Sequence, residues 1–400
     1  MRMVAPAGMP ISLGEISHAL WLRLTHPDAA DEFRQDMADM TGASHCFLVN
    51  SGRTALFVLL KALMMVSGKT KDEVIIPAYT CYSVAAAVVR AGLKIRLVDI
   101  NPMAMDYCAE SLARTDCRRV LAAIECNLFG IPGCFSQLKS VTEGMDVALI
   151  DDAAQAMGGK AEGGIVGARG DAGLFSLDRG KSLSTYSGGV LLTSDDGIAE
   201  GIEQQLCSLG SGGVFSEASL VAKLTAYSLF LRPQLYWLPE SLPFLGLGET
   251  VYDESFAVSG LSVLQGCAGQ VLFDRLSALN DQRRKVATAL AGSLITTGEY
   301  EIPGYGVESC PAYVRLPVLA RTQEVRDYAI ERLRNRGIVA SRMYPTTIHN
   351  IPGIRDRLAG ESREFPGAER VVRCLLTLPT HPYVSHYDID AIISCLSHLQ

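Results

Sequence analysis

Short apolar runs alternate with helical patterns between residues 15 and 200, and this alternation restricts the fold more than any other feature of the chain. Such alternation is the signature of βαβ units, in which parallel strands are joined through helices. Apolar residues at helical spacing over Thr54–Met65, and a run of small residues over Ser83–Ala91, predict two of these helices. The expected strands are Glu73–Pro77, Ile95–Val98, Val120–Ile124, Val147–Ile150, Leu174–Ser176 and Gly189–Thr193. The pattern therefore predicts an α/β chain with a mainly parallel sheet.

The remaining sequence predicts a smaller α+β lobe. A helical stretch over Leu261–Leu294 is rich in Ala, Leu and Arg, and we expect it to link the lobes. The elements expected after it are a strand at Tyr313–Pro317, a helix at Gln323–Arg336, a strand near Ile338–Ser341 and a helix at Tyr387–Leu399. We place the domain boundary near residue 255. The large domain then spans 1–255 with an apolar insert at about 208–250, and the linking helix and small domain span 256–400.

Composition excludes several classes of protein. The 400 residues are 48% apolar and carry a net charge of −7, which disfavours disorder and a nucleic-acid surface. The eleven cysteines show no zinc-type spacing, and the residues near Asp151 offer too few ligands for a metal site. We interpret the cysteines as free thiols in a reducing compartment. The start of the chain, Met1–Pro10, has too short an apolar run for a signal peptide, so we expect a cytoplasmic protein.

The apolar segment Leu220–Leu247 allows two interpretations. Lys223, Arg232 and Glu240 interrupt it, and three prolines break it, so it is too short to span a membrane as a helix. It is either a buried element between lobes or subunits, or an apolar surface for a greasy substrate or a membrane interface.

Chemically active residues follow the expected strands, at the edge where ligands of open α/β sheets bind. The turn Asn50–Thr54 leads into a helix, whose N-terminus suits an anion such as phosphate. Asp151 and Asp152 end a buried strand, where two carboxylates are unfavourable unless they are paired. Lys181 lies between two strands and is flanked by glycines, so it is either a surface lysine or a Schiff-base residue.

Taken together, these motifs resemble the DegT/DnrJ/EryC1/StrS family of aminotransferases, which use pyridoxal 5′-phosphate (PLP) on fold type I. The resemblance extends from about Glu32 to Leu399. It rests on the segments NSGRTAL, EVIIPAYTCYSVAAAVVRAGLKIRLVDI, ALIDDAAQAMGG, GDAGLFSLDRGKSLSTYSGGVLLTSD, RGIVASRMYP and LLTLPTHPYVSHYDID. It implies a large domain with a mainly parallel seven-stranded sheet flanked by helices, followed by a smaller C-terminal α+β domain.

The resemblance also implies roles for individual residues. Lys181 would form the Schiff base with PLP and move the substrate proton, and Asp152 would keep the pyridine nitrogen protonated. Gln155 would lie near the 3-oxygen of the ring. Ser176 and the turn residues Gly52, Arg53 and Thr54 would hold the phosphate. The dehydratase branch of the family has histidine in place of this lysine, so Lys181 favours an aminotransferase.

Several positions depart from the family pattern. Cys81 stands where the family has an aromatic residue that stacks on the ring, so either Tyr82 stacks there or Cys81 packs against it. Arg53 replaces a common Thr and would contact either the phosphate or a neighbouring helix. Tyr186-Ser187 replaces the usual Gly-Glu. Glu254–Ser259 stands where sugar aminotransferases carry a Gly-x-Asn-x-Arg segment whose Asn reaches the phosphate of the neighbouring subunit.

The expected function is transfer of an amino group from an amino acid, by family habit glutamate, to a nucleotide-linked keto-sugar. The alternatives are an apolar or lipid-like ketone as acceptor, a lyase or decarboxylase of the same fold, and a PLP-binding paralogue without activity. Arg342, Tyr344 and His349 are candidates for substrate binding, although Arg342 alone is as consistent with a surface ion pair, and His349 and His381 with structural roles. We expect a homodimer by resemblance, and Leu220–Leu247 is the candidate for peripheral membrane or lipid contact.

Overall fold

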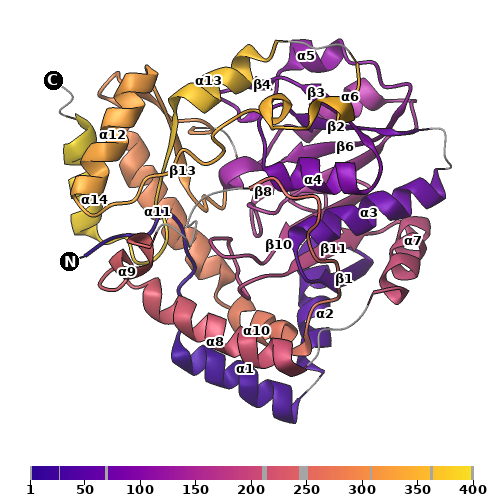
Figure 1. Ribbon diagram of the computed structural model, residues 1–400, viewed down its shortest axis with the longest axis horizontal. Coiled ribbons are helices and arrows are strands. Elements are labelled where there is room, and N and C mark those ends of the chain that lie inside the picture. Colours follow the sequence, from indigo (N-terminus) through magenta and orange to yellow (C-terminus); the bar gives the residue numbers. More distant parts are fainter. Residues whose placement is uncertain are drawn as a thin grey trace.

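A seven-stranded sheet lies at the centre of the larger lobe in a computed structural model (Figure 1). The structure describes residues 2–26, 28–67, 71–209, 214–242, 251–306, 309–360 and 364–397. The strand order is β1-β11-β10-β7-β6-β2-β3. The five strands from β10 to β3 are parallel, and β11 is antiparallel to both of its neighbours. Their bounds are β1 His45–Val49, β2 Glu73–Pro77, β3 Lys94–Val98, β6 Val120–Cys126, β7 Ala148–Asp152, β10 Ala172–Ser176 and β11 Gly189–Thr193.

The predicted mainly parallel sheet is therefore confirmed, and all six expected strands are present. The sequence analysis did not include the edge strand β1, which pairs with β11 from His45 to Val49.

Helices cover both faces of this sheet, because successive strand side chains point to opposite faces. In β2, Val74 and Ile76 join one core with helices α3 and α4, whereas Ile75 joins another with Phe135 and Leu138 of α6. The helices up to α7 are α1 Leu13–Thr25, α2 Ala29–Thr41, α3 Gly52–Val66, α4 Tyr82–Arg90, α5 Ala109–Ala113, α6 Phe135–Thr142 and α7 Asp196–Cys207. Short strands β4 Ile100–Asn101 and β5 Asp106–Tyr107 form one hairpin, and β8 Lys160–Ala161 and β9 Gly164–Ile165 form another.

The C-terminal part forms a second, antiparallel sheet of three strands, ordered β12-β13-β14. Its strands are β12 Tyr300–Glu301, β13 Leu316–Ala320 and β14 Leu375–Leu378, and its helices are α12 Gln323–Asn335, α13 Pro366–Cys374 and α14 His386–Ser397. The expected strand at Tyr313–Pro317 is misplaced by three residues. Tyr313 has φ of +42°, which is outside the strand region, so pairing begins only at Leu316.

The strand expected near Ile338–Ser341 is wrong. Ile338 and Ser341 each make a single bridge, to Val4 and Thr377 respectively, so no continuous ladder forms. The final helix ends at Ser397, and the rest of its expected range lies outside the described residues.

The expected linking helix is two helices, α10 Val263–Phe273 and α11 Leu276–Ile295. They pack against different parts of the chain: α10 contacts α1 and α2, and α11 contacts α14. α10 approaches α2 so closely that a Cβ on Gly266 would lie 2.4 Å from the Cβ of Ala30. Asp274 and Arg275 separate the two helices.

The described part of the apolar insert folds back onto the start of the chain. It contains α8 Val214–Phe230 and α9 Trp237–Glu240. Leu231 and Tyr236 pack with Met3 and Ala5, and with Val339 and Tyr383 of the small lobe. Leu231 and Tyr236 thus lie between the lobes, whereas Phe230, Leu238 and Leu242 of the same segment are exposed. Residues 243–247 lie outside the described residues. Among the helices that the structure describes, none is both long and apolar enough to cross a membrane.

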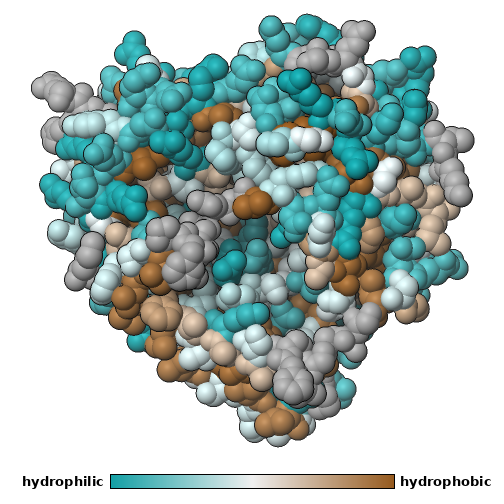
Figure 2. Space-filling model, viewed as in Figure 1, coloured by the Kyte–Doolittle hydropathy of each residue, from teal (hydrophilic) through white to brown (hydrophobic). Residues whose placement is uncertain are grey.

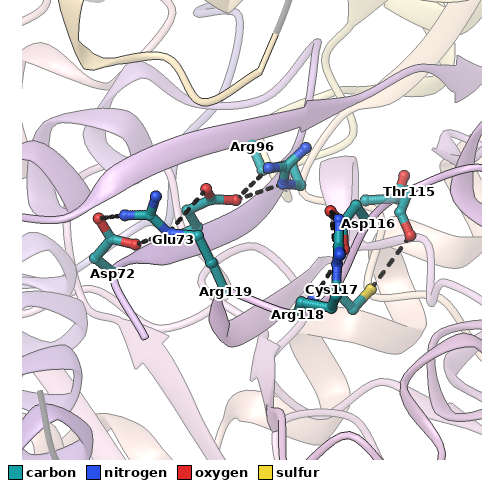
Figure 3. A network of polar contacts seen from close by, with 8 residues as sticks. All are labelled: Asp72, Glu73, Arg96, Thr115, Asp116, Cys117, Arg118 and Arg119. Atoms are coloured by element: carbon teal, nitrogen blue, oxygen red, sulfur yellow. Dashed lines mark hydrogen bonds and ion pairs between the residues drawn. The ribbon is translucent and has the colours of Figure 1, made fainter. Parts of the chain in front are cut away.

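Charged residues join the amino ends of the strands (Figure 3). Glu73 at the start of β2 is buried and accepts a hydrogen bond of 2.5 Å from Arg96 Nε in β3. Arg119, just before β6, donates to the carboxylate of Asp72. This network links three adjacent strands at the edge opposite the one where the candidate site lies.

Candidate active site

The carboxyl ends of β2, β6, β7 and β10 border a cavity of about 490 Å³. Its other walls come from the start of α3, the loop before β11 and the small lobe, and Figure 2 shows the molecule hollowed near the middle of this face. This position follows the general rule for ligand sites in open α/β sheets. The sequence-predicted site residues that line it are Gly52, Arg53, Cys81, Asp152, Gln155, Ser176, Lys181 and Tyr344.

The two adjacent carboxylates at the end of β7 have different surroundings, because neighbouring strand residues face opposite ways. Asp151 is fully buried and pairs with Arg169, whose Nη2 lies 2.8 Å from Oδ1 and whose Nε lies 2.9 Å from Oδ2. The Asn127 side chain and the Gly167 amide also donate to Asp151. Asp151 is therefore a structural, neutralised carboxylate.

Asp152 instead faces the cavity. Its side chain is buried, and it accepts a hydrogen bond of 2.9 Å from the Ala154 amide. Burial raises its pKa to about 6, and the Ala154 hydrogen bond and the charge of Lys181 counteract this only in part. A buried carboxylate with this shifted pKa is suited to a cationic ligand atom, such as a protonated ring nitrogen.

The turn before α3 forms a cradle beside Ser176. Ser51 caps the helix by accepting a hydrogen bond of 3.1 Å from the Thr54 amide. A Cβ on Gly52 would lie 3.0 Å from the Cβ of Ser176, so only glycine leaves this space open. The first amides of a helix have no acceptor within it and bind anions well. This arrangement fits a phosphate group.

The side chains of Thr54 and Arg53 make contacts of different kinds. Thr54 Oγ1 donates to Asn50 Oδ1 at 2.6 Å and to the Ala257 carbonyl at 3.2 Å, so it fixes the turn. The Arg53 guanidinium lies over the Phe256 ring, 5.3 Å from its centroid, and 3.8 Å from Asp253 Oδ2. The guanidinium thus contacts the segment before α10.

Lys181 lies in the loop between β10 and β11 and lines the cavity. Its carbonyl oxygen accepts a hydrogen bond of 3.2 Å from the guanidinium of Arg283, a fully buried residue of α11. Arg283 also donates to the carbonyls of Gly8 and Ser182 and to Asn280 Oδ1. A single side chain therefore ties the Lys181 loop to α11 and to the start of the chain.

Cys81 and Tyr82, the two alternatives for a stacking residue, point to different places. Cys81 lines the cavity. Tyr82 does not: its hydroxyl accepts from the Thr346 amide at 2.9 Å and donates to the Thr346 carbonyl at 3.1 Å. Tyr344 lines the cavity, and its hydroxyl accepts a hydrogen bond of 3.2 Å from Gln155 Nε2. Gln155 Oε1 in turn accepts from the Phe129 amide.

Three further candidates lie outside the cavity wall. Arg342 is 54% exposed, and its guanidinium lies 2.9 Å from Asp327 Oδ1. His349 packs on the Phe365 ring, and burial lowers its pKa. His381 is buried with Nε2 2.8 Å from the Ala5 carbonyl, and burial lowers its pKa to about 4. The structure thus gives each of them a partner away from the site.

Sequence reasoning missed Arg315 and did not assign a role to Tyr186, although both line the cavity. Tyr186 has φ of +74°, a conformation uncommon for residues other than glycine, and such residues cluster at functional sites. The Arg179 guanidinium lies over its ring at 5.1 Å. The available signal for Arg315 was a charged residue inside the apolar run Tyr313–Leu316.

Comparison with known proteins gives the family. The sequence model of the DegT/DnrJ/EryC1/StrS aminotransferase family matches residues 14–397, so the chain belongs to this family. The enzyme is therefore an aminotransferase that uses PLP. Within the described residues, no group of three or more His, Cys, Asp or Glu side chains is placed to hold a metal ion.

Individual relatives are distant. UDP-N-acetyl-3-dehydro-alpha-D-glucosamine 3-aminotransferase of Acidithiobacillus ferrooxidans is 26% identical over 90% of this chain and 86% of its own. GDP-4-keto-6-deoxy-D-mannose 3-dehydratase of Yersinia pseudotuberculosis is 28% identical, but the match spans only 43% of this chain and 44% of that relative. The crystal structure of S. venezuelae DesV in complex with a ketimine intermediate has a TM-score of 0.76 and 22% identity, covering 96% of this chain and 94% of that one. This likeness shows the fold.

Proposed function

We propose that this aminotransferase moves an amino group from an amino acid, with glutamate as the donor, to the keto group of a nucleotide-linked sugar. One observation carries the cofactor part of the proposal. A buried carboxylate (Asp152), a primary amine (Lys181) and an anion cradle (Gly52 and Ser176) line the same cavity. A PLP molecule carries a ring nitrogen, an aldehyde and a phosphate that match these three groups.

The residues have distinct tasks in this proposal. PLP supplies a ring that withdraws electrons from the bond being broken at the amino-bearing carbon. Asp152 would hold a proton on the ring nitrogen. The positive charge of that nitrogen would lower the pKa of Asp152, because it offsets the effect of burial. Lys181 would hold the cofactor through its amine, and the same amine would serve as the base that moves the substrate proton. The Arg283 contact holds the Lys181 backbone in place for both steps.

Ser176 and the amides at Gly52 and Arg53 hold the phosphate in this proposal. Thr54 stabilises the turn that carries these amides through the hydrogen bonds of its side chain. Gln155 is the candidate for the 3-oxygen of the ring. Cys81, which lines the cavity, is favoured over Tyr82 as the residue that packs against the ring. Tyr344 is a candidate contact for substrate, whereas the ion pair of Arg342 and the packing of His349 against the Phe365 ring disfavour such a role for these two.

The sugar acceptor is supported by the A. ferrooxidans relative, whose name specifies a UDP-linked keto-sugar and which matches most of the chain. Lys181 favours amino transfer over dehydration. An apolar ketone is less well supported, because Leu220, Leu224, Leu231 and Tyr236 of the insert are buried within the chain. This chain has Glu254–Ser259 in place of the Gly-x-Asn-x-Arg segment, so the proposal assigns no residue to a phosphate contact from a neighbouring subunit.

We also propose that the domain boundary lies near residue 255.

We propose in addition that the protein is a homodimer. Helix α1 exposes Leu13, Trp21 and Leu24, and Val263 at the start of α10 is exposed as well. Apolar side chains gather at this lower edge of Figure 2, where α1, α8 and α10 lie (Figure 1). Exposed apolar patches of this kind mark association surfaces. Light scattering at micromolar concentration tests the dimer, and a mainly monomeric mass contradicts it. The cytoplasm is the compartment that free thiols favour.

Turnover assays test the reaction. Purified enzyme with PLP and glutamate is offered nucleotide-linked keto-sugars in one series and acyl ketones in another, and the amino product is measured. Amination confined to the sugars, with no flotation of the protein on liposomes, supports the proposal. Amination of acyl ketones alone, or full turnover by Lys181→Ala, contradicts it.

A further inference from the structure

Arg315 is a cavity-lining cation without a partner. It directly precedes β13 of the small lobe and lines the cavity beside Tyr344. Its Nη1 atom is buried and makes no hydrogen bond, and in the described part of the chain Arg315 forms no ion pair. Burial lowers the pKa of Arg315, and the nearby hydroxyls of Tyr344 and Tyr236 counteract this only in part.

The other arginines near the site are all occupied. Arg169 pairs with Asp151, and Arg283 donates to four oxygen acceptors. Arg53 lies between Asp253 and Phe256, and Arg179 lies over Tyr186 and 3.8 Å from Asp178. Arg315 differs from these neighbours because, in the described part of the chain, its guanidinium makes neither a hydrogen bond nor an ion pair, and its Nη1 atom is buried in the cavity wall.

A guanidinium stays charged in proteins, so Arg315 cannot relieve its burial by losing a proton. A buried charge without a partner is unfavourable, and a bidentate carboxylate is the anion that best matches its planar fork. Asp152 does not serve, because its carboxylate accepts from the Ala154 amide and, within the described residues, forms no ion pair with Arg315. The cofactor phosphate does not serve either in our proposal, because its cradle is built from the start of α3 and the end of β10.

We propose that Arg315 binds the carboxylate of the amino-acid donor. The donor must bring its amino-bearing carbon to Lys181, and its carboxylate is attached to that same carbon. Both residues line one cavity of about 490 Å³, in which the cofactor would also lie. Tyr344 lines the same cavity, and its hydroxyl, which accepts a hydrogen bond from Gln155, would donate to the same carboxylate. This inference rests on the proposed function, because it needs an amino acid as the donor.

The test compares wild type with Arg315→Met, which keeps the side-chain length and removes the charge. Absorbance of the PLP-loaded proteins is followed as L-glutamate is added, and binding of unreactive glutarate is measured by calorimetry. We expect Arg315→Met to need at least tenfold more glutamate for half of the spectral change and to bind glutarate at least tenfold more weakly. Its response to propylamine, which lacks a carboxylate, should stay as in wild type.

Two controls separate donor binding from folding. Arg321→Met removes an exposed arginine just beyond the far end of β13 and should behave as wild type in both titrations. The melting temperature of unliganded Arg315→Met should equal or exceed that of wild type, because the substitution removes a half-buried charge whose buried Nη1 atom has no partner. If Arg315→Met does not fold, Arg315→Lys serves, with a smaller loss expected because lysine lacks the fork.

Three results would overturn the inference. The first is equal glutamate and glutarate titrations for wild type and the Arg315 variants. The second is a loss in Arg342→Met with none in Arg315→Met. The third is loss of the propylamine response together with a lower melting temperature, which would mark a structural role. A wild type that responds to propylamine but to no amino acid would instead refute the proposed donor class.

Discussion

Replacing Asp152 by Asn should stabilise the cofactor-free protein at neutral and basic pH. The pKa of this carboxyl is raised from 3.8 to about 6 by burial, so the folded state keeps a proton that the unfolded state has released. Stability must then fall as the pH rises through this interval. A shift of roughly 2 units corresponds to about 3 kcal/mol at pH 8 and to less than about 1 kcal/mol at pH 4.

Asn removes this penalty and keeps an oxygen to accept the Ala154 hydrogen bond. For a chain of this length, about 3 kcal/mol corresponds to a rise in melting temperature of about 3–4 °C. The assay is thermal unfolding of cofactor-free wild type and Asp152→Asn at pH 8 and pH 4. The same substitution should abolish most of the transamination, because the ring nitrogen loses its proton-holding partner.

Asp151→Asn is the matched control, one residue away on the same strand. It leaves the buried Arg169 guanidinium without its carboxylate, and breaking such a pair costs about 3–5 kcal/mol. The neighbouring substitutions should therefore change the melting temperature in opposite directions at pH 8. Destabilisation by both, or a gain for Asp152→Asn that is equal at the two pH values, would refute the assignment of the two carboxylates.

Three further predictions concern the surroundings of the site. Gly52→Ala places a Cβ 3.0 Å from that of Ser176, so the Kd for PLP should rise at least tenfold in fluorescence titrations. Gly14→Ala is the control, because its Cβ meets nothing nearer than 3.8 Å, and it should leave this Kd unchanged. An unchanged Kd for Gly52→Ala would argue against the cradle. In Arg283→Lys, the lysine amine cannot reach all four acceptors of the Arg283 guanidinium. We therefore expect kcat to fall about tenfold with little change in the KM for glutamate. A change in KM alone would contradict the role of Arg283 in positioning the Lys181 backbone. Glu73→Gln, at the opposite edge of the sheet, should lower the melting temperature because it breaks the buried pair with Arg96. It should leave the Kd for PLP as in wild type. A weaker PLP complex would contradict this and show that the network is coupled to the site.

The parts of the fold that were predictable from the sequence are those with local signals. The β-strands of the parallel sheet are continuous apolar runs, and Ser51 caps α3 through a contact three residues away. The break between α10 and α11 has no such signal. It depends on how α10 packs against α1 and α2, contacts that span more than 200 residues. The same holds for the start of the chain, where Val4 bridges Ile338 and Gly8 accepts from Arg283.

The candidate site divides in the same way. Lys181, Asp152 and Ser176 follow strand ends and stand in recognisable motifs, so their gathering in one cavity was predictable. The sequence could not distinguish Arg342 from Arg315, because that choice depends on which guanidinium has an acid nearby. Asp327 neutralises Arg342 from a neighbouring helix, and no carboxylate in the described residues does so for Arg315. The orientation of Tyr82 was also beyond the sequence, since it depends on Thr346 of the small lobe.

The role of Lys181 is tested most directly by the absorbance spectrum of the purified, PLP-loaded protein before and after addition of L-glutamate, with Lys181→Ala as the control. We expect a visible band in wild type that fades as glutamate transfers its amino group, and no such fading in Lys181→Ala. A visible band that no amino acid changes would contradict the proposed donor. Fading and full turnover in Lys181→Ala would contradict the central role of Lys181.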